Sequence, residues 1–222
     1  MNSVEQATRV VLRPIGNPFP LGFLALAGGT LLVSGLQLAW LAPSDGMQVA
    51  LIVIAFVVPL QLLASIFGFL ARDVVAGTGM GVLAGSWLSI GLVTLTSKAG
   101  AVSAPLGLLL LLAAAALLAP AAAAATGKLV PAAVLFTTAI RFATTGLYEL
   151  TDSSAWQQVA GLVGLVLCAL ALYTALAMTL EDAKRRTVLP LARREAGDDS
   201  LGAGFDAQLD RLEHEAGVRE QL

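Results

Sequence analysis

The chain contains six apolar segments that are each long enough to cross a lipid bilayer. They cover roughly residues 21–41, 48–70, 78–97, 104–125, 130–150 and 156–180. A membrane-spanning helix needs about 20 mostly apolar residues. Because lipid offers the backbone no hydrogen bonds, only helices and closed barrels can span it, and these segments lack the alternating pattern of barrel strands. The sequence therefore predicts an all-α, polytopic membrane protein with six transmembrane helices in a lipid bilayer.

The composition agrees with this fold class and divides the chain into three parts. Of the 222 residues, 57% are hydrophobic and 13% are charged, whereas a soluble domain carries about 25% charged residues. A net charge of −2 gives no indication of nucleic-acid binding. The first apolar run is too long for a cleavable signal peptide, so we expect it to remain as a span. The expected parts are an N-terminal segment (1–16), a transmembrane domain (17–180) and a polar tail (181–222).

The basic residues near the segment ends predict the orientation of the chain. One side collects Arg9, Arg13, Arg72, Lys128, Lys184, Arg185 and Arg186, and the other side has Lys98. Cytoplasmic loops carry the excess of Lys and Arg. We therefore expect both termini in the cytoplasm and the protein in the plasma or inner membrane, which the even number of spans allows.

Two segments carry small residues at the spacing of a close helix–helix contact. Gly81 and Gly85 lie four residues apart in the third segment, and Ala160, Gly164 and Cys168 repeat that spacing in the sixth. Either a neighbouring helix of the same chain or a second protomer could pack there.

The apolar segments hold no set of residues for catalysis or metal binding. They contain no histidine, and their acidic residues lie at the edges. The single histidine, His214, falls in the tail, where Phe205, Leu209, Leu212 and Ala216 predict a short amphipathic helix. We therefore expect no catalytic residue, no metal site and no cofactor, and the protein is predicted not to be an enzyme.

The fifth segment carries a charge near its middle. Arg141 shares one helix face with several polar residues, namely Thr137, Thr138, Thr144, Thr145 and Tyr148. A lone charge at this depth costs at least ~2.5–3.5 kcal/mol and usually faces a bundle interior or a water-filled cavity. One interpretation is an anion-attracting stripe along a pathway, because an arginine fork suits a carboxylate. The other is a structural arginine paired with Glu149 or with backbone carbonyls, with threonines bonded to their own helix turns.

The second segment adds one buried polar candidate. Gln61 follows Pro59 by two residues. It could line the same pathway as Arg141, or it could form a hydrogen bond between helices.

The first segment begins with Asn17-Pro18-Phe19-Pro20-Leu21-Gly22. This stretch resembles the N-P-x-P-L-G signature of the acetate uptake transporter family, the acetate/succinate permease group. Three further features are similar to that family: six spans, the Gly85-Ser86-Trp87 stretch, and Arg186-Thr187-Val188-Leu189-Pro190 after the last span. The resemblance covers about residues 16–191.

The resemblance implies a fold, a substrate class and an assembly. The six helices would pack around a central pore in each protomer, and the protomers would form a homo-oligomer, a hexamer in the family. The protein would be a carrier or channel for small monocarboxylate anions such as acetate, with succinate as a further substrate and protons as the coupled ion.

The resemblance also implies a substrate path. Asn17, Pro18, Pro20, Leu21 and Gly22 would form its entrance, where Asn17 caps the helix and free backbone amides meet a carboxylate. Family members narrow the pore with aromatic side chains at the positions of Leu26 and Ala84. Both residues are smaller here, so Phe19 or Trp87 could refill the gap. Together with Leu26 and Ala84, Trp87 is the expected constriction, and Gln61, Arg141, Thr144 and Thr145 are the further expected substrate-binding residues.

Two other functions stay open at this point. The protein could be a membrane scaffold or sensor of the same fold that signals through residues 181–222. It could also carry another small solute, such as ammonia or a neutral acid.

Overall fold

The computed structural model describes residues 16–184 and 186–193 and confirms the all-α prediction. Six stretches of helix in this part of the chain are long and apolar enough to cross a membrane. In chain order the elements are α2 (Phe19–Gln37), η1 (Pro43–Asp45), α3 (Gly46–Ile52), η2 (Val53–Val57), α4 (Val58–Leu70), α5 (Val74–Thr96), α6 (Ala104–Ala125), α7 (Leu129–Thr151) and α8 (Ser154–Lys184). The predicted tail helix with His214, and the segment before Gly16, lie outside the described residues.

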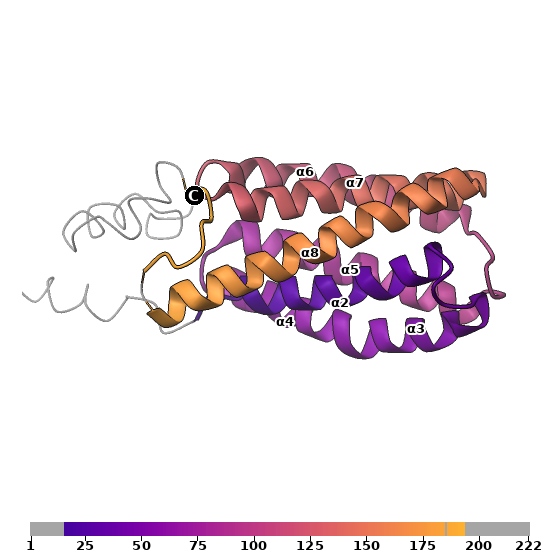
Figure 1. Ribbon diagram of the computed structural model, residues 1–222, viewed down its shortest axis with the longest axis horizontal. Helices are drawn as coiled ribbons and strands as arrows, with labels where there is room; N and C mark the ends of the chain where they lie inside the picture. The colour runs from indigo at the N-terminus through magenta and orange to yellow at the C-terminus, as the bar shows by residue number, and fades with distance from the viewer. Residues whose placement is uncertain (1–15, 185, 194–222) are drawn as a thin grey trace, which may run out of the picture.

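The six spans form a closed ring (Figure 1). Helix α2 packs against α8, α8 against α7, α7 against α6, α6 against α5, α5 against α4, and α4 returns to α2. Neighbours in this order run antiparallel. We call the end where α2 begins and α8 finishes the proximal end, and the opposite one the distal end. A ring of this kind gives the chain an interior that is shielded from lipid on all sides.

Several element bounds differ from the expected ones. The first span ends at Gln37 and not near residue 41, because Ala39 takes a left-handed backbone with φ of 57° and turns the chain. The last span continues to Lys184, where Glu181 is buried and forms ion pairs with Lys128 and Arg193. A local backbone turn therefore sets the first of these bounds and ion pairs accompany the second, and the apolar pattern alone contains neither.

The second span is one continuous helical rod with an irregular middle. A single π-helical turn, Val53–Val57, joins α3 to α4 directly before Pro59. Proline lacks an amide proton and its ring collides with the carbonyl four residues earlier. A π-helical turn is one way in which a helix absorbs such a break.

Side chains near the helix starts bind free backbone amides. The Asp73 carboxylate accepts the N–H of Ala76 at the start of α5. Asn17 Oδ1 accepts the N–H of Phe19 at 3.0 Å. This hydrogen bond agrees with the expected capping role of Asn17, although the helix bounds place Pro18 in the cap position.

The small-residue faces divide between two roles. In α8, Ala160, Gly164 and Cys168 are buried, and Gly164 lies directly against α2, so this face packs inside the protomer. In α5, Gly81 lies against Ser65 of α4, whereas Gly85 is exposed and has open space beside it. The two glycines of the third span therefore do not form one close contact within this chain.

Candidate functional site

Polar side chains line the interior of the ring at several depths. Thr30, Ser34 and Gln37 follow one another along one face of α2, Gln61 comes from α4, and Arg141 comes from α7. All are at most 7% exposed. Several of their polar atoms have no hydrogen-bond partner in the described part of the chain, namely Thr30 Oγ1, Ser34 Oγ, Gln37 Oε1, both side-chain polar atoms of Gln61, and Arg141 Nε. Buried polar atoms are normally paired, so these unpaired groups mark the interior as a candidate binding region.

Arg141 is the buried charge of this interior. Its side chain is 2% exposed, and its Nη1 donates a hydrogen bond to Thr145 Oγ1 at 2.9 Å. No ion pair to Arg141 occurs within residues 16–184 and 186–193. Glu149, the alternative partner, instead accepts the backbone N–H of Ser103 at 2.7 Å. The predicted pairing of Arg141 with Glu149 is therefore wrong, and the guanidinium has no carboxylate beside it.

Ser34 approaches Arg141 where α8 comes closest to both. A Cβ placed on Gly164 would collide with Ser34 Oγ and lie 2.8 Å from Arg141 Nε. The hydroxyl of α2 and the guanidinium of α7 thus occupy the same small volume over a glycine of α8. Neither Ser34 Oγ nor Arg141 Nε has a hydrogen-bond partner among the described residues.

The threonines of α7 bond mainly to their own helix. Thr138 donates to the carbonyl of Val134, and both Thr144 and Thr145 donate to the carbonyl of Arg141. Thr145 also accepts the hydrogen bond from the Arg141 side chain. Of the expected threonine partners, Thr145 therefore contacts the guanidinium, and Thr144 does not share a hydrogen bond with it.

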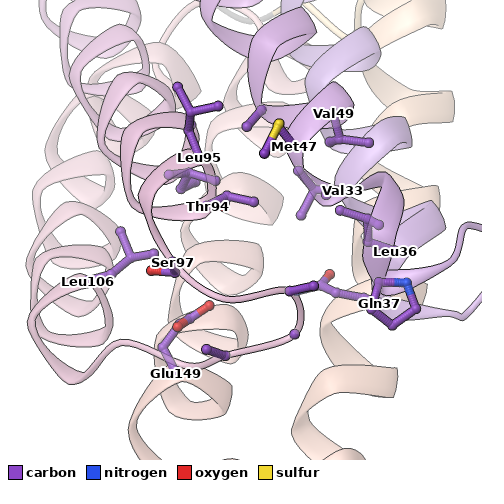
Figure 2. A pocket seen from close by; sticks show the side chains of 18 of the residues that line it. Val33, Leu36, Gln37, Met47, Val49, Thr94, Leu95, Ser97, Leu106 and Glu149 are labelled. Atoms are coloured by element: carbon purple, nitrogen blue, oxygen red, sulfur yellow. The ribbon is translucent and has the colours of Figure 1, made fainter.

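A cavity of about 210 Å³ occupies the distal end of the ring (Figure 2). Its walls come from the distal ends of all six spans, from η1 and from the loop after α5. Its polar lining includes Gln37 of α2, Lys98 of that loop, and Thr145, Tyr148 and Glu149 of α7. Thr145 joins this distal cavity to Arg141. The cavity therefore leads from the distal surface toward the buried charge.

Aromatic side chains also fill the interior of the ring. Trp87 of α5 lies edge-on to Phe142 of α7, with ring centroids 6.1 Å apart. A Cβ on Gly29 of α2 would lie 3.3 Å from the Trp87 ring, so the indole reaches across to α2. Leu26 and Ala84 are also buried, at 0% and 4% exposure. All three residues expected at the constriction thus lie in the interior, and Phe142 joins Trp87 there.

The residues of the first motif lie at the other end of the ring. Asn17 is exposed, Pro18 and Gly22 are buried, and Pro20 and Leu21 are half-buried at the start of α2. None of them lines the distal cavity, and neither do Gln61, Leu26 and Ala84. The structure places the expected site residues at three depths of one bundle, with Thr145 alone among them in the wall of the distal cavity.

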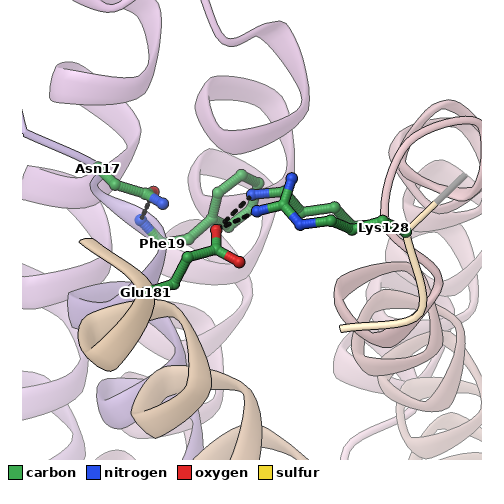
Figure 3. Close-up of polar contacts among 5 residues, drawn as sticks. Asn17, Phe19, Lys128 and Glu181 are labelled. Carbon is green, nitrogen blue, oxygen red and sulfur yellow. Dashed lines mark hydrogen bonds and ion pairs between the residues drawn. The ribbon is translucent and has the colours of Figure 1, made fainter. Parts of the chain in front are cut away.

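Three charged residues close the proximal end (Figure 3). Glu181 of α8 pairs with Lys128, which precedes α7, and with Arg193. Burial lowers the pKa of Lys128, Arg193 lowers it further, and Glu181 opposes both. The segment that carries Arg193 runs across the start of α7, where the amides of Leu129 and Val130 donate to its carbonyls. We call Lys128, Glu181 and Arg193 the proximal clasp.

Sequence reasoning missed several residues that the structure brings to this interior. Thr30, Ser34 and Gln37 are spaced by four and three residues, so their shared helix face was a usable signal. Phe142 and Gly164 carry no such signal, because an aromatic residue and a glycine in an apolar span are equally consistent with plain packing.

These features define the class of the protein. It is a multi-pass helical membrane protein whose single chain encloses a polar interior, with a cavity at one end. The chain belongs to the GPR1/FUN34/yaaH family, which its residues 2–193 match.

Curated relatives and a solved structure agree with that membership. The chain is 26% identical over 181 residues to the succinate-acetate/proton symporter SatP of Escherichia coli strain K12, covering 80% of this chain and 95% of that protein. The same protein of Shigella flexneri matches equally. A solved structure described as the bacterial acetate channel SatP aligns with a TM-score of 0.71 at 25% identity, over 80% of this chain and 99% of the other.

Proposed function

We propose that this protein moves small monocarboxylate anions, acetate first among them, through the interior of its six-helix ring. The observation that carries the proposal is the Arg141 guanidinium, buried beside Ser34 and Thr145 with no carboxylate partner in the described residues. The names of the relatives, which refer to acetate and succinate, support the same substrate class.

The energetics favour an anionic occupant at Arg141. An unpaired charge in the middle of a span costs at least ~2.5–3.5 kcal/mol. A carboxylate passing through would supply the missing partner, and charge-assisted hydrogen bonds from a guanidinium are about twice as strong as neutral ones. The same charge repels ammonium, so the observation speaks against a cation carrier.

The proposed path runs the length of the ring. The anion enters the distal cavity, binds at Arg141, Ser34 and Thr145, passes Trp87, Phe142, Leu26 and Ala84, meets the Gln61 amide, and leaves near Asn17 and the start of α2. The apolar side chains that follow Arg141 along this path form a narrow zone that admits small carboxylates. This is a transport role and not an enzymatic one.

The assembly and the coupling belong to the same proposal. The protein sits in the cell membrane with both termini in the cytoplasm, so that the distal cavity opens to the outside. It moves its substrate together with protons and assembles as a homo-oligomer, a hexamer by family resemblance, in which each protomer has its own path.

Labelled acetate uptake into proteoliposomes tests the proposal. Purified protein should give saturable uptake above protein-free liposomes, and unlabelled acetate should compete with it. Arg141→Leu should lower this uptake at least about tenfold, the effect of losing roughly 1.4 kcal/mol of anion binding. Arg141→Lys keeps the charge and should retain more of the uptake than Arg141→Leu.

One result would overturn the proposed transport, and another would overturn only the role of Arg141 in it. Wild-type protein without competable uptake of acetate or of a related acid would remove the transport function. Normal uptake by a well-folded Arg141→Leu variant would leave transport in place but assign Arg141 a structural role.

A further inference from the structure

A carboxylate lies in the wall of the distal cavity (Figure 2). Glu149 of α7 is the acidic residue among those that line this cavity in the described chain. Its Oε2 accepts the backbone N–H of Ser103 at 2.7 Å, which fixes the side chain against the start of α6. Its Oε1 accepts no hydrogen bond within residues 16–184 and 186–193, so one oxygen stays available.

Glu149 lies on the same face of α7 as the proposed anion site. Thr145 is four residues before it and Arg141 is eight residues before it, so the three side chains follow one another along that face. Thr145 and Glu149 both line the cavity, and Thr145 holds the Arg141 guanidinium. An anion that travels from the distal surface to Arg141 therefore passes Glu149 first.

The charge balance of the cavity depends on the protonation state of this carboxyl. Lys98 and Tyr148 are the other titratable residues in the cavity wall. Asp152, at the end of α7, and Asp45, in η1, lie at the same end of the ring but do not line the cavity. With Glu149 ionised, its charge cancels that of Lys98. With Glu149 neutral, Lys98 and the deeper Arg141 leave the entrance positive.

We propose that Glu149 is a proton-binding residue that controls the entry of anions into the distal cavity. The inference rests on the proposed transport of carboxylates. In the ionised state Glu149 repels the incoming carboxylate. A proton from water at the distal end adds to Oε1 while Oε2 keeps the N–H of Ser103, the repulsion disappears, and the anion proceeds to Arg141. The proton returns to the same water when Glu149 ionises again.

Glu149→Gln is the sharp test, because the amide oxygen can still accept the N–H of Ser103 but cannot titrate. Uptake of labelled acetate, corrected with protein-free liposomes at each pH, should rise about tenfold in wild type from neutral to acidic pH, as expected for removing one like charge near the path. The Glu149→Gln variant should take up acetate at neutral pH as fast as wild type does at acidic pH, and its corrected profile should be flat.

The test of Glu149 includes a matched control variant and a second measurement. Asp152→Asn removes a neighbouring carboxylate outside the cavity and should keep the wild-type pH profile. Infrared difference spectra between acidic and neutral pH should show a carboxyl band that is missing in Glu149→Gln and present in Asp152→Asn. Size-exclusion and thermal unfolding profiles confirm that each variant is folded.

The outcomes separate the two proposals. A folded Glu149→Gln variant with the wild-type pH profile overturns the role of Glu149 while acetate transport stands. Wild-type protein without uptake overturns the transport function. Even if transport is absent, the infrared band still shows whether Glu149 binds a proton. If Glu149→Gln leaves the difference spectrum unchanged, proton binding by Glu149 is overturned as well.

Discussion

Gly164 controls how closely three helices meet around the buried charge. Its missing side chain lets Ser34 of α2 and Arg141 of α7 share one small volume against α8. Because protein interiors are densely packed, a single added methyl group at such a point must displace its neighbours. This glycine therefore helps to determine the geometry of the proposed anion site.

Gly164→Ala should destabilise the protein and weaken acetate uptake together. The new methyl group would collide with Ser34 Oγ and press on Arg141, and overpacking of this kind costs about 1–3 kcal/mol. Thermal unfolding in detergent measures the first effect and proteoliposome uptake the second. Gly85→Ala is the control, since Gly85 has open space beside it and should change neither. Equal unfolding temperatures for the two variants would contradict the packing at Gly164.

Trp87→Ala should change which acids pass. The indole meets Phe142 and reaches toward Gly29, so its removal would widen the interior, at a cost of about 3–5 kcal/mol in stability. We expect succinate uptake to rise relative to acetate uptake in competition assays. Trp40→Ala, at a side chain that is 63% exposed, should leave the ratio unchanged. An unchanged ratio in a folded Trp87→Ala variant would place the narrowest point elsewhere.

At the scale of single residues, the sequence predicts which side chains are buried better than it predicts which residues they contact. The depth of Arg141 and its position on a polar helix face followed from spacing, and the structure places it in the interior. Its neighbours did not follow, because Ser34 lies more than a hundred positions away in the chain and arrives through the contact of α2 with α8. The same holds for Glu149, which is close enough in sequence to suggest a pair with Arg141 but instead binds Ser103.

For the helices, the sequence predicts that each span exists, whereas the folded structure determines where each span begins and ends. Apolar length predicted all six spans, since a bilayer demands about 20 such residues whatever their neighbours are. The bounds depended on local geometry, as at Ala39, Arg72 and Asp152, whose positive φ values end or redirect the chain. The π-helical turn before Pro59 also escaped prediction, because a proline in a span predicts a break but not how it is absorbed.

Asp73→Ala should weaken the start of α5. The Asp73 carboxylate accepts the N–H of Ala76 at 2.9 Å, and loss of such a cap typically costs about 1 kcal/mol. The unfolding temperature should drop, with faster hydrogen exchange at the Ala76 amide. Asp73→Asn preserves an acceptor in the same place and should lose much less. If both variants lose the same stability, the charge of Asp73 and not its cap hydrogen bond is responsible.

For the molecule as a whole, the proximal clasp fixes the last described segment across the start of α7. Lys128, Glu181 and Arg193 tie α8, α7 and the chain after α8 together, and Leu191 of that segment is buried at 1% exposure. The amides of Leu129 and Val130 bond to the carbonyls of Ala192 and Leu191. These contacts lie at the proximal end of the ring, where the proposed path ends.

Glu181→Gln should loosen the clasp without unfolding the ring. Hydrogen exchange at the Leu129 and Val130 amides should be about tenfold faster, which corresponds to roughly 1.4 kcal/mol. The pKa of Lys128, already lowered by burial and by Arg193, should fall further because Glu181 raises it more than Asp73, the other carboxylate that does so. Asp182→Asn alters an exposed neighbouring carboxylate and should change neither measurement. Unaltered exchange in Glu181→Gln would show that Leu191 and the backbone bonds alone hold the segment.

The pairing of α2 with α8 has a consequence for how the protein is made. The first span emerges from the ribosome long before the last one, yet its most extensive contact is with that last span. Until α8 arrives, the side of α2 that carries Thr30, Ser34 and Gln37 faces lipid or a helper protein and has no lasting neighbour. Completion of the ring, and with it the burial of Arg141 beside Ser34, is therefore a late event in biosynthesis. A chain that stops before residue 154 would lack α8. It would remain in the membrane as an open ring with an exposed polar face and without the proposed anion site.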